Sequence, residues 1–173
     1  MWGKTFAGMC VMLGASGFGW SVCQEMKHML FHLEEQKRML LYIEREISFM
    51  HRPMQENFVS VSSRLREPYR TFVLEVAACM EERDGRALRD IWHDRAELLK
   101  KTGEYPAEAV RMLHRMEESL GCEEDKMQIE ALRLLETELS ELISLRTKEK
   151  EEKSRLIQTL SVLAGIFCIV LFI

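Results

Sequence analysis

The side chains that could carry chemistry in this sequence are few, and histidines come first. His28 and His32 stand four residues apart, a spacing that places two imidazoles on one helical face, where they can bind a metal ion with Glu35 as a third ligand. The same spacing suits the solvated face of a helix. We favour that interpretation, because nothing in the spacing secures the third ligand, and we expect neither a metal ion nor another cofactor.

The other histidines are isolated in the sequence. His93 precedes Asp94, which resembles half of a catalytic pair, but no nucleophile motif such as G-x-S-x-G accompanies them. His51 and His114 are interpreted, like His93, as surface residues or satisfied core residues. The sequence also contains no phosphate-binding glycine loop after a strand and no H-E-x-x-H motif. We therefore expect that the protein is not an enzyme.

An acidic group marks the beginning of the last predicted helix. Glu123, Glu124 and Asp125 lie close together just after Gly121. Acidic side chains at the start of a helix complement its dipole, and this structural role is the favoured interpretation. The functional alternative is an acidic docking edge for a basic face on a cytoplasmic partner. Both interpretations remain open at this point.

Two uncharged runs lie at the ends of the chain. Residues 5–24 and 156–173 carry no charged side chain. Eighteen helical residues rise about 27 Å, close to the ~30 Å hydrocarbon core of a bilayer, so each run is predicted to span a membrane. A cleaved signal peptide is the alternative for the first run, but its length and the lack of a clear cleavage site favour an uncleaved anchor. The candidates for close packing of membrane helices are small residues: Gly14, Ala15, Gly19 and Gly165.

Basic residues flank the inner ends of both runs. Lys27, Lys37 and Arg38 follow the first run, and five lysines and arginines lie within 146–155. The positive-inside rule therefore predicts a cytoplasmic central region with both termini on the far side. A net charge of −4 with interleaved acids and bases argues against nucleic-acid binding. The predicted domains are an N-terminal transmembrane helix (1–24), a cytoplasmic helical domain (25–155) and a C-terminal transmembrane helix (156–173).

Proline and glycine divide the central region into helices. Pro53, Pro68 and Pro106 are suited to helix starts, whereas Gly103 and Gly121 are suited to helix ends. No segment shows convincing strand alternation. The predicted fold class is all-α, a six-helix cytoplasmic bundle between two transmembrane helices. The expected helices cover residues 25–50, 53–63, 68–84, 86–101, 106–121 and 122–173.

The first and last of these helices each carry an apolar seam. Within 25–50 the apolar residues follow a four-three repeat that is interrupted only by Gln36, and the leucines from Leu132 to Leu142 recur at spacings of three and four. Because both helices would be anchored in the same membrane, we expect them to run antiparallel, side by side.

Three short motifs occur in a fixed order and spacing. They are Glu46-Ile47-Ser48-Phe49 with Pro53-Met54, then Ser119-Leu120-Gly121 with Asp125 and Gln128, and then Leu160-Ser161-Val162-Leu163-Ala164-Gly165. These motifs resemble those of the stage III sporulation protein AB family, and the order of parts also matches along nearly the whole chain. Two positions depart from the family pattern: Arg52, where a small or threonine-like residue often occurs, and Ala164, where a second glycine often occurs.

The resemblance implies a non-enzymatic membrane platform of the channel between mother cell and forespore. The family is related to the inner-membrane platform proteins of type II secretion and type IV pilus systems, which have a six-helix cytoplasmic domain. The implied partners are a cytoplasmic secretion-type ATPase, stage III sporulation protein AA, other membrane proteins of the channel and the lipid bilayer. The implied location is the mother-cell membrane around the forespore, with the central domain in the cytoplasm.

The resemblance carries over no catalytic residue. It implies a structural cap for Gly121 and roles in starting the helix or contacting a partner for Asp125 and Gln128, which match the family motif. Together with Glu123 and Glu124, these residues form the candidate structural or partner-contact group. A membrane-anchored signalling or regulatory helical protein is the alternative function.

Overall fold

The structure is a computed structural model. It describes the backbone of residues 2–50, 53–82, 85–103, 105–120 and 125–172. Side chains are described for 21–49, 53–82, 85–103, 105–120, 126–161 and 163. The chain divides into two compact units, one made of Met29–Ile143 and the other of Met1–His28 with Ser144–Ile173.

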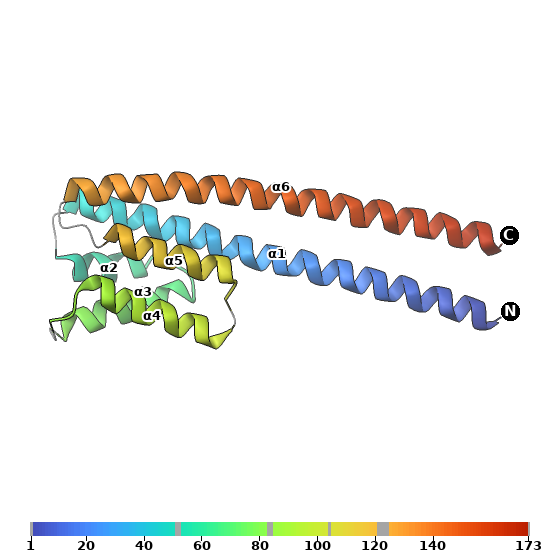
Figure 1. Ribbon diagram of the computed structural model, residues 1–173, viewed down its shortest axis with the longest axis horizontal. Helices are drawn as coiled ribbons and strands as arrows, with labels where there is room; N and C mark the ends of the chain where they lie inside the picture. Colours follow the sequence, from blue (N-terminus) through green and yellow to red (C-terminus); the bar gives the residue numbers. More distant parts are fainter. Residues whose placement is uncertain (1, 51–52, 83–84, 104, 121–124, 173) are drawn as a thin grey trace. The chain divides into compact units, whose positions relative to one another are not determined.

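The described residues form six helices and no strand, which confirms the predicted all-α class. The second unit consists of the N-terminal part of the first helix and the C-terminal part of the last. In Figure 1 the helices are labelled in chain order. Their bounds are α1 Trp2–Met50, α2 Met54–Ser62, α3 Tyr69–Glu81, α4 Leu88–Thr102, α5 Ala107–Leu120 and α6 Asp125–Phe172.

Local signals set the helix ends close to where the sequence predicts them. The carbonyl oxygen of Pro53 accepts a hydrogen bond from the backbone N–H of Glu56 at 3.0 Å, so this proline caps α2 one residue before the helix begins. At the end of α4, Gly103 has a φ of 69° and donates its N–H to Lys100. Only glycine adopts this left-handed conformation without a steric cost, which explains why the helix ends there.

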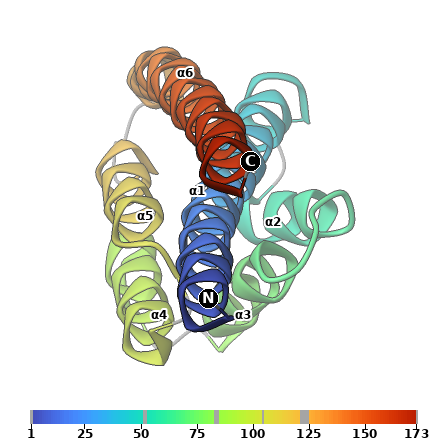
Figure 2. The ribbon, with the colours of Figure 1, turned by 90° about the vertical axis from the view of Figure 1, so that its right-hand side faces the viewer.

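Within Met29–Ile143, α1 contacts α6 and the four short helices follow one another in space. Figure 2 shows α2, α3, α4 and α5 in chain order along an arc. Lys37 of α1 pairs with Glu136 of α6 at 3.7 Å, and Arg133 of α6 donates to Glu44 of α1 at 2.7 Å. From the first pair to the second, the residue number rises in α1 and falls in α6. These segments therefore run antiparallel, as predicted.

Trp92 of α4 lies at the centre of the apolar core. Its side chain is completely buried, and its ring meets Phe72 of α3 edge-on with 4.9 Å between centroids. The indole N–H donates to the carbonyl oxygen of Leu113 in α5 at 2.9 Å. The large apolar ring is therefore buried without leaving its polar nitrogen unsatisfied, and it joins three helices.

Polar side chains are also buried where α1 crosses α3 and α5. Gln36 donates from Nε2 to the hydroxyl oxygen of Tyr69 at 3.0 Å and to the carbonyl oxygen of Ala109 at 2.7 Å. The Tyr69 hydroxyl lies 3.0 Å from Nδ1 of His32, to which it can donate its own proton. Burial raises the pKa of Tyr69, so that proton is retained. Gln36, which interrupts the apolar seam of α1, thus lies at a junction of three helices.

The expectation of a solvated helix face at His32 and Glu35 is wrong. Both side chains are buried. Glu35 accepts a hydrogen bond from the backbone N–H of Arg66 at 2.8 Å and pairs with Arg38 at 3.5 Å. The physical reason is that residues of the loop before α3 and of α3 itself supply the partners that water would otherwise provide.

Among the residues that the structure describes, no helix has an apolar stretch long enough to cross a membrane. Most of both predicted spans lies where side chains are not described, within residues 1–20 and 164–173. Gly14, Ala15, Gly19 and Gly165 fall in this part, so their predicted packing role lies outside the described residues.

We expect Tyr69→Phe to destabilise the bundle by about 1–3 kcal/mol, because it leaves His32 and Gln36 buried with one partner fewer. Thermal unfolding followed by circular dichroism measures this change. The matched control is Tyr42→Phe, which removes the same atom from a half-buried ring and should change stability by less than about 0.5 kcal/mol. Equal melting temperatures for the two variants would contradict the junction at Tyr69.

Candidate functional site

The α5–α6 corner contains the residues that the sequence singles out. Gly121, Glu123 and Glu124 lie between the two helices, outside the described residues. Asp125 is the first described residue of α6, and its side chain is not described. Gln128 is the one member of this group whose side chain the structure describes.

Gln128 holds the corner together from inside. Its side chain is only 4% exposed, and Nε2 donates a hydrogen bond of 3.1 Å to the carbonyl oxygen of Leu120. Leu120 is the last residue of α5, where a carbonyl group has no partner within its own helix. Gln128 therefore satisfies the end of one helix from the first turn of the next, and it is too buried to contact a partner directly.

A groove runs between α5 and α6 beside this corner. Its volume is about 250 Å³. Arg115 of α5 and Glu138 of α6 form an ion pair at the groove. The lining combines polar and apolar side chains. It is formed by Arg115, Glu118 and Ser119 from α5 and by Ala131, Leu134, Leu135 and Glu138 from α6.

Apolar side chains continue from the groove along the outer face of α6. Leu134 is 73% exposed and Met127 is 59% exposed. They are seven residues apart, which places them two turns apart on one helical face with Ala131 between them. Exposed apolar residues aligned on one face beside a groove are typical of a surface that binds another protein. We call Met127, Ala131 and Leu134 the α6 stripe.

The chain around the α6 stripe is strongly acidic. Residues 118–130 include five acidic residues and one basic residue, Lys126. Glu118 and Glu130 are exposed. The acidic residues that the sequence analysis singles out therefore precede the α6 stripe in the chain.

The first family-like motif lies at the α1–α2 junction. Glu46 is buried, accepts a hydrogen bond from the hydroxyl of Ser60 at 2.9 Å and lies 3.6 Å from the guanidinium of Arg64. Phe49, three residues later, is largely exposed. The buried glutamate fixes the end of α1 to α2, so its role is structural.

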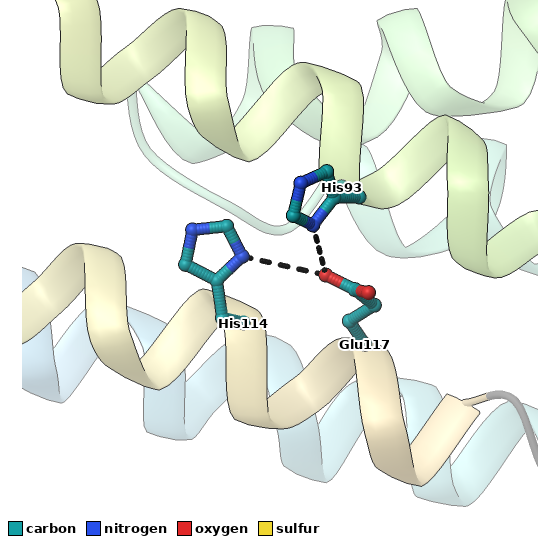
Figure 3. A group of neighbouring side chains, drawn as sticks. All are labelled: His93, His114 and Glu117. Atoms are coloured by element: carbon teal, nitrogen blue, oxygen red, sulfur yellow. Dashed lines mark hydrogen bonds and ion pairs between the residues drawn. The ribbon is translucent and has the colours of Figure 1, made fainter.

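A second polar cluster lies between α4 and α5, and the sequence pattern does not predict it. His93 and His114 are isolated in the sequence, but the structure brings both imidazoles to one carboxylate, that of Glu117 (Figure 3). The proximity of His114 and Glu117 is predictable from the sequence, because they are three residues apart and share a helical face. The approach of His93 on α4 is not predictable in this way, because it depends on tertiary packing.

Glu117 is the centre of that cluster. Burial by itself raises the pKa of its carboxyl group, but hydrogen bonds involving His93, His114 and Arg89 outweigh burial and lower the pKa below its ordinary value. At neutral pH the buried carboxylate is therefore ionised and is surrounded by nitrogen atoms.

We expect Gln128→Leu to destabilise the protein by about 1–3 kcal/mol, because it leaves the Leu120 carbonyl buried without its partner. Thermal unfolding measures the change. Met127→Gln, one residue away and exposed, is the control and should leave stability within about 0.5 kcal/mol. A Gln128→Leu protein as stable as the control would show that this hydrogen bond does not hold the corner.

Comparisons with known proteins agree with this fold. The family model of stage III sporulation protein AB matches residues 4–173. A solved structure described as stage III sporulation protein AB resembles this chain with a TM-score of 0.64 at 15% sequence identity. The match covers 72% of this chain and 98% of that one. A search of curated proteins found no match. The chain therefore belongs to the stage III sporulation protein AB family.

Proposed function

We propose that the protein is a non-enzymatic membrane platform in the channel between mother cell and forespore, and that its helical domain couples a cytoplasmic ATPase to that channel. The observation that carries the proposal is the family match over residues 4–173, which supports a role in sporulation. The proposed partners are stage III sporulation protein AA and the other membrane proteins of the channel.

The membrane location rests on the two uncharged runs, 5–24 and 156–173. Each is long enough to cross a bilayer as a helix, and basic residues follow the first run and precede the second. In this arrangement the Met29–Ile143 bundle lies in the cytoplasm, where a soluble ATPase can reach it.

The α6 stripe is the proposed contact surface for the ATPase. Its apolar side chains offer area to bury, and the acidic residues around it select a basic partner face. The buried Gln128 supports this surface by fixing α6 against the end of α5. The contact is therefore expected to use a rigid helix face, which lowers the entropic cost of binding.

Reporter fusions test the membrane arrangement. We expect a reporter that is active only outside the cytoplasm to be active at both termini, and a cytoplasmic reporter to be active when inserted at Thr102-Gly103, a helix end in the middle of the bundle. The opposite pattern, or a full-length protein recovered without detergent in the soluble fraction, would contradict the platform.

Leu134→Lys tests the contact surface. We expect it to weaken binding of the full-length protein to purified stage III sporulation protein AA by at least about tenfold. The reason is that Leu134 is exposed in the free protein but becomes buried in the proposed complex, where a lysine would be charged. Surface plasmon resonance measures the affinity. Complementation of a deletion strain should show a matching loss of spores.

Leu98→Lys is the matched control. Leu98 is 49% exposed on α4 and lies outside the α6 stripe, so its replacement should leave binding unchanged. Equal effects of the two substitutions would contradict the stripe as the contact surface. Normal sporulation of the deletion strain would contradict the proposed function itself.

A further inference from the structure

The cluster between α4 and α5 has the composition of a metal site. A nitrogen atom from His93, a nitrogen atom from His114 and a carboxylate oxygen of Glu117 all lie within 4.8 Å of one another. Figure 3 shows one nitrogen of each imidazole directed at the same oxygen of Glu117. Two imidazoles and one carboxylate form a ligand set that zinc uses in proteins.

One of the two contacts with Glu117 has the length of an edge of a tetrahedral zinc site. Nδ1 of His93 lies 3.0 Å from Oε2 of Glu117, and Nδ1 of His114 lies 3.3 Å from the same oxygen. Ligand atoms about 2.0–2.1 Å from a tetrahedral zinc ion are separated by about 3.3–3.4 Å. An N–H···O hydrogen bond usually spans about 2.7–3.2 Å, so the contact of His114 is long for a hydrogen bond but suits a tetrahedral edge.

The other nitrogen of His114 supports the same interpretation. Nε2 lies 3.2 Å from Oε1 of Glu97, a carboxylate that can only accept a hydrogen bond. A proton on Nε2 leaves Nδ1 with a lone pair that faces the Glu117 oxygen. Two acceptors so placed need a proton or a cation between them. A carboxylate that orients the outer nitrogen of a ligating histidine is a common feature of zinc sites.

The surrounding packing holds the ligands in position. Trp92 and Leu113, the residues immediately before His93 and His114, are joined by the hydrogen bond from the indole to the Leu113 carbonyl oxygen. This bond fixes α4 against α5 at the level of the cluster. Arg89 donates to Oε1 of Glu117 at 3.3 Å and leaves Oε2 to the histidines.

We propose that His93, His114 and Glu117 bind one Zn²⁺ ion, which links α4 to α5. The ligand set favours zinc over Mg²⁺ or Ca²⁺, which prefer oxygen ligands. Three protein ligands leave the fourth position to water, and His93 is 52% exposed, so the ion can enter from solvent. The proposal does not depend on the proposed role in sporulation.

Calorimetric titration of the full-length, metal-free protein in detergent with zinc chloride tests the site. We expect one zinc ion per chain and a melting temperature about 5–10 °C higher at a hundredfold excess over Kd. Glu97 contacts a ligand rather than the ion, so Glu97→Gln should weaken binding by about 10–100-fold. His93→Gln and Glu117→Gln each remove a ligand and should weaken binding by more than that. His93 is exposed, so its variant should fold even if the Glu117 variant does not.

His28→Gln is the control, because it removes one histidine without touching the cluster and should leave the affinity unchanged. X-ray absorption of the zinc-loaded protein should show nitrogen and oxygen ligands at about 2.0–2.1 Å. A sulfur shell at about 2.3 Å would place the ion on the cysteines and overturn the proposal. Absence of saturable binding, or equal affinity in the wild type and His93→Gln, would also overturn it.

Discussion

The bundle depends on the hydrogen bonds that the buried side-chain nitrogen of Gln36 donates from α1. Gln36 lies at the centre of this helix, with no exposed surface, and reaches α3 and α5 at once through the Tyr69 hydroxyl and the Ala109 carbonyl oxygen. Leaving this buried donor without its partners would cost about 1–3 kcal/mol. This requirement fixes one relative position of the three helices, whereas apolar packing alone would tolerate several.

The helix ends were predictable because their causes are local. Gly103 ends α4 by adopting a positive φ, and Pro53 caps α2, so each signal acts within one turn of the chain. The burial of His32 and Glu35 was not predictable in the same way. Their partners, Tyr69 and the backbone of Arg66, are more than thirty residues away, and no periodic pattern in α1 reveals them.

The candidate surfaces were likewise only partly predictable from the sequence. The sequence placed acidic residues and Gln128 at the start of the last helix, but it did not separate a buried structural amide from an exposed edge. The α6 stripe was visible in principle, since Met127 and Leu134 share a spacing of seven, yet the same spacing also describes buried leucines of that helix. The positions of α1 and α5 decide which apolar face of α6 is covered. The α4–α5 cluster likewise joins two histidines that are twenty-one residues apart.

The pairing of α1 with α6 has a consequence for synthesis of the chain. Glu44 and Arg133, which join the two helices, are separated by 89 positions. A ribosome must therefore complete α2, α3, α4 and α5 before the nascent α1 finds this neighbour. Until then the face of α1 that meets α6 stays uncovered, and closing so long a loop is slow compared with forming local helix pairs. We expect the short helices to assemble first and the C-terminal helix to close the bundle last.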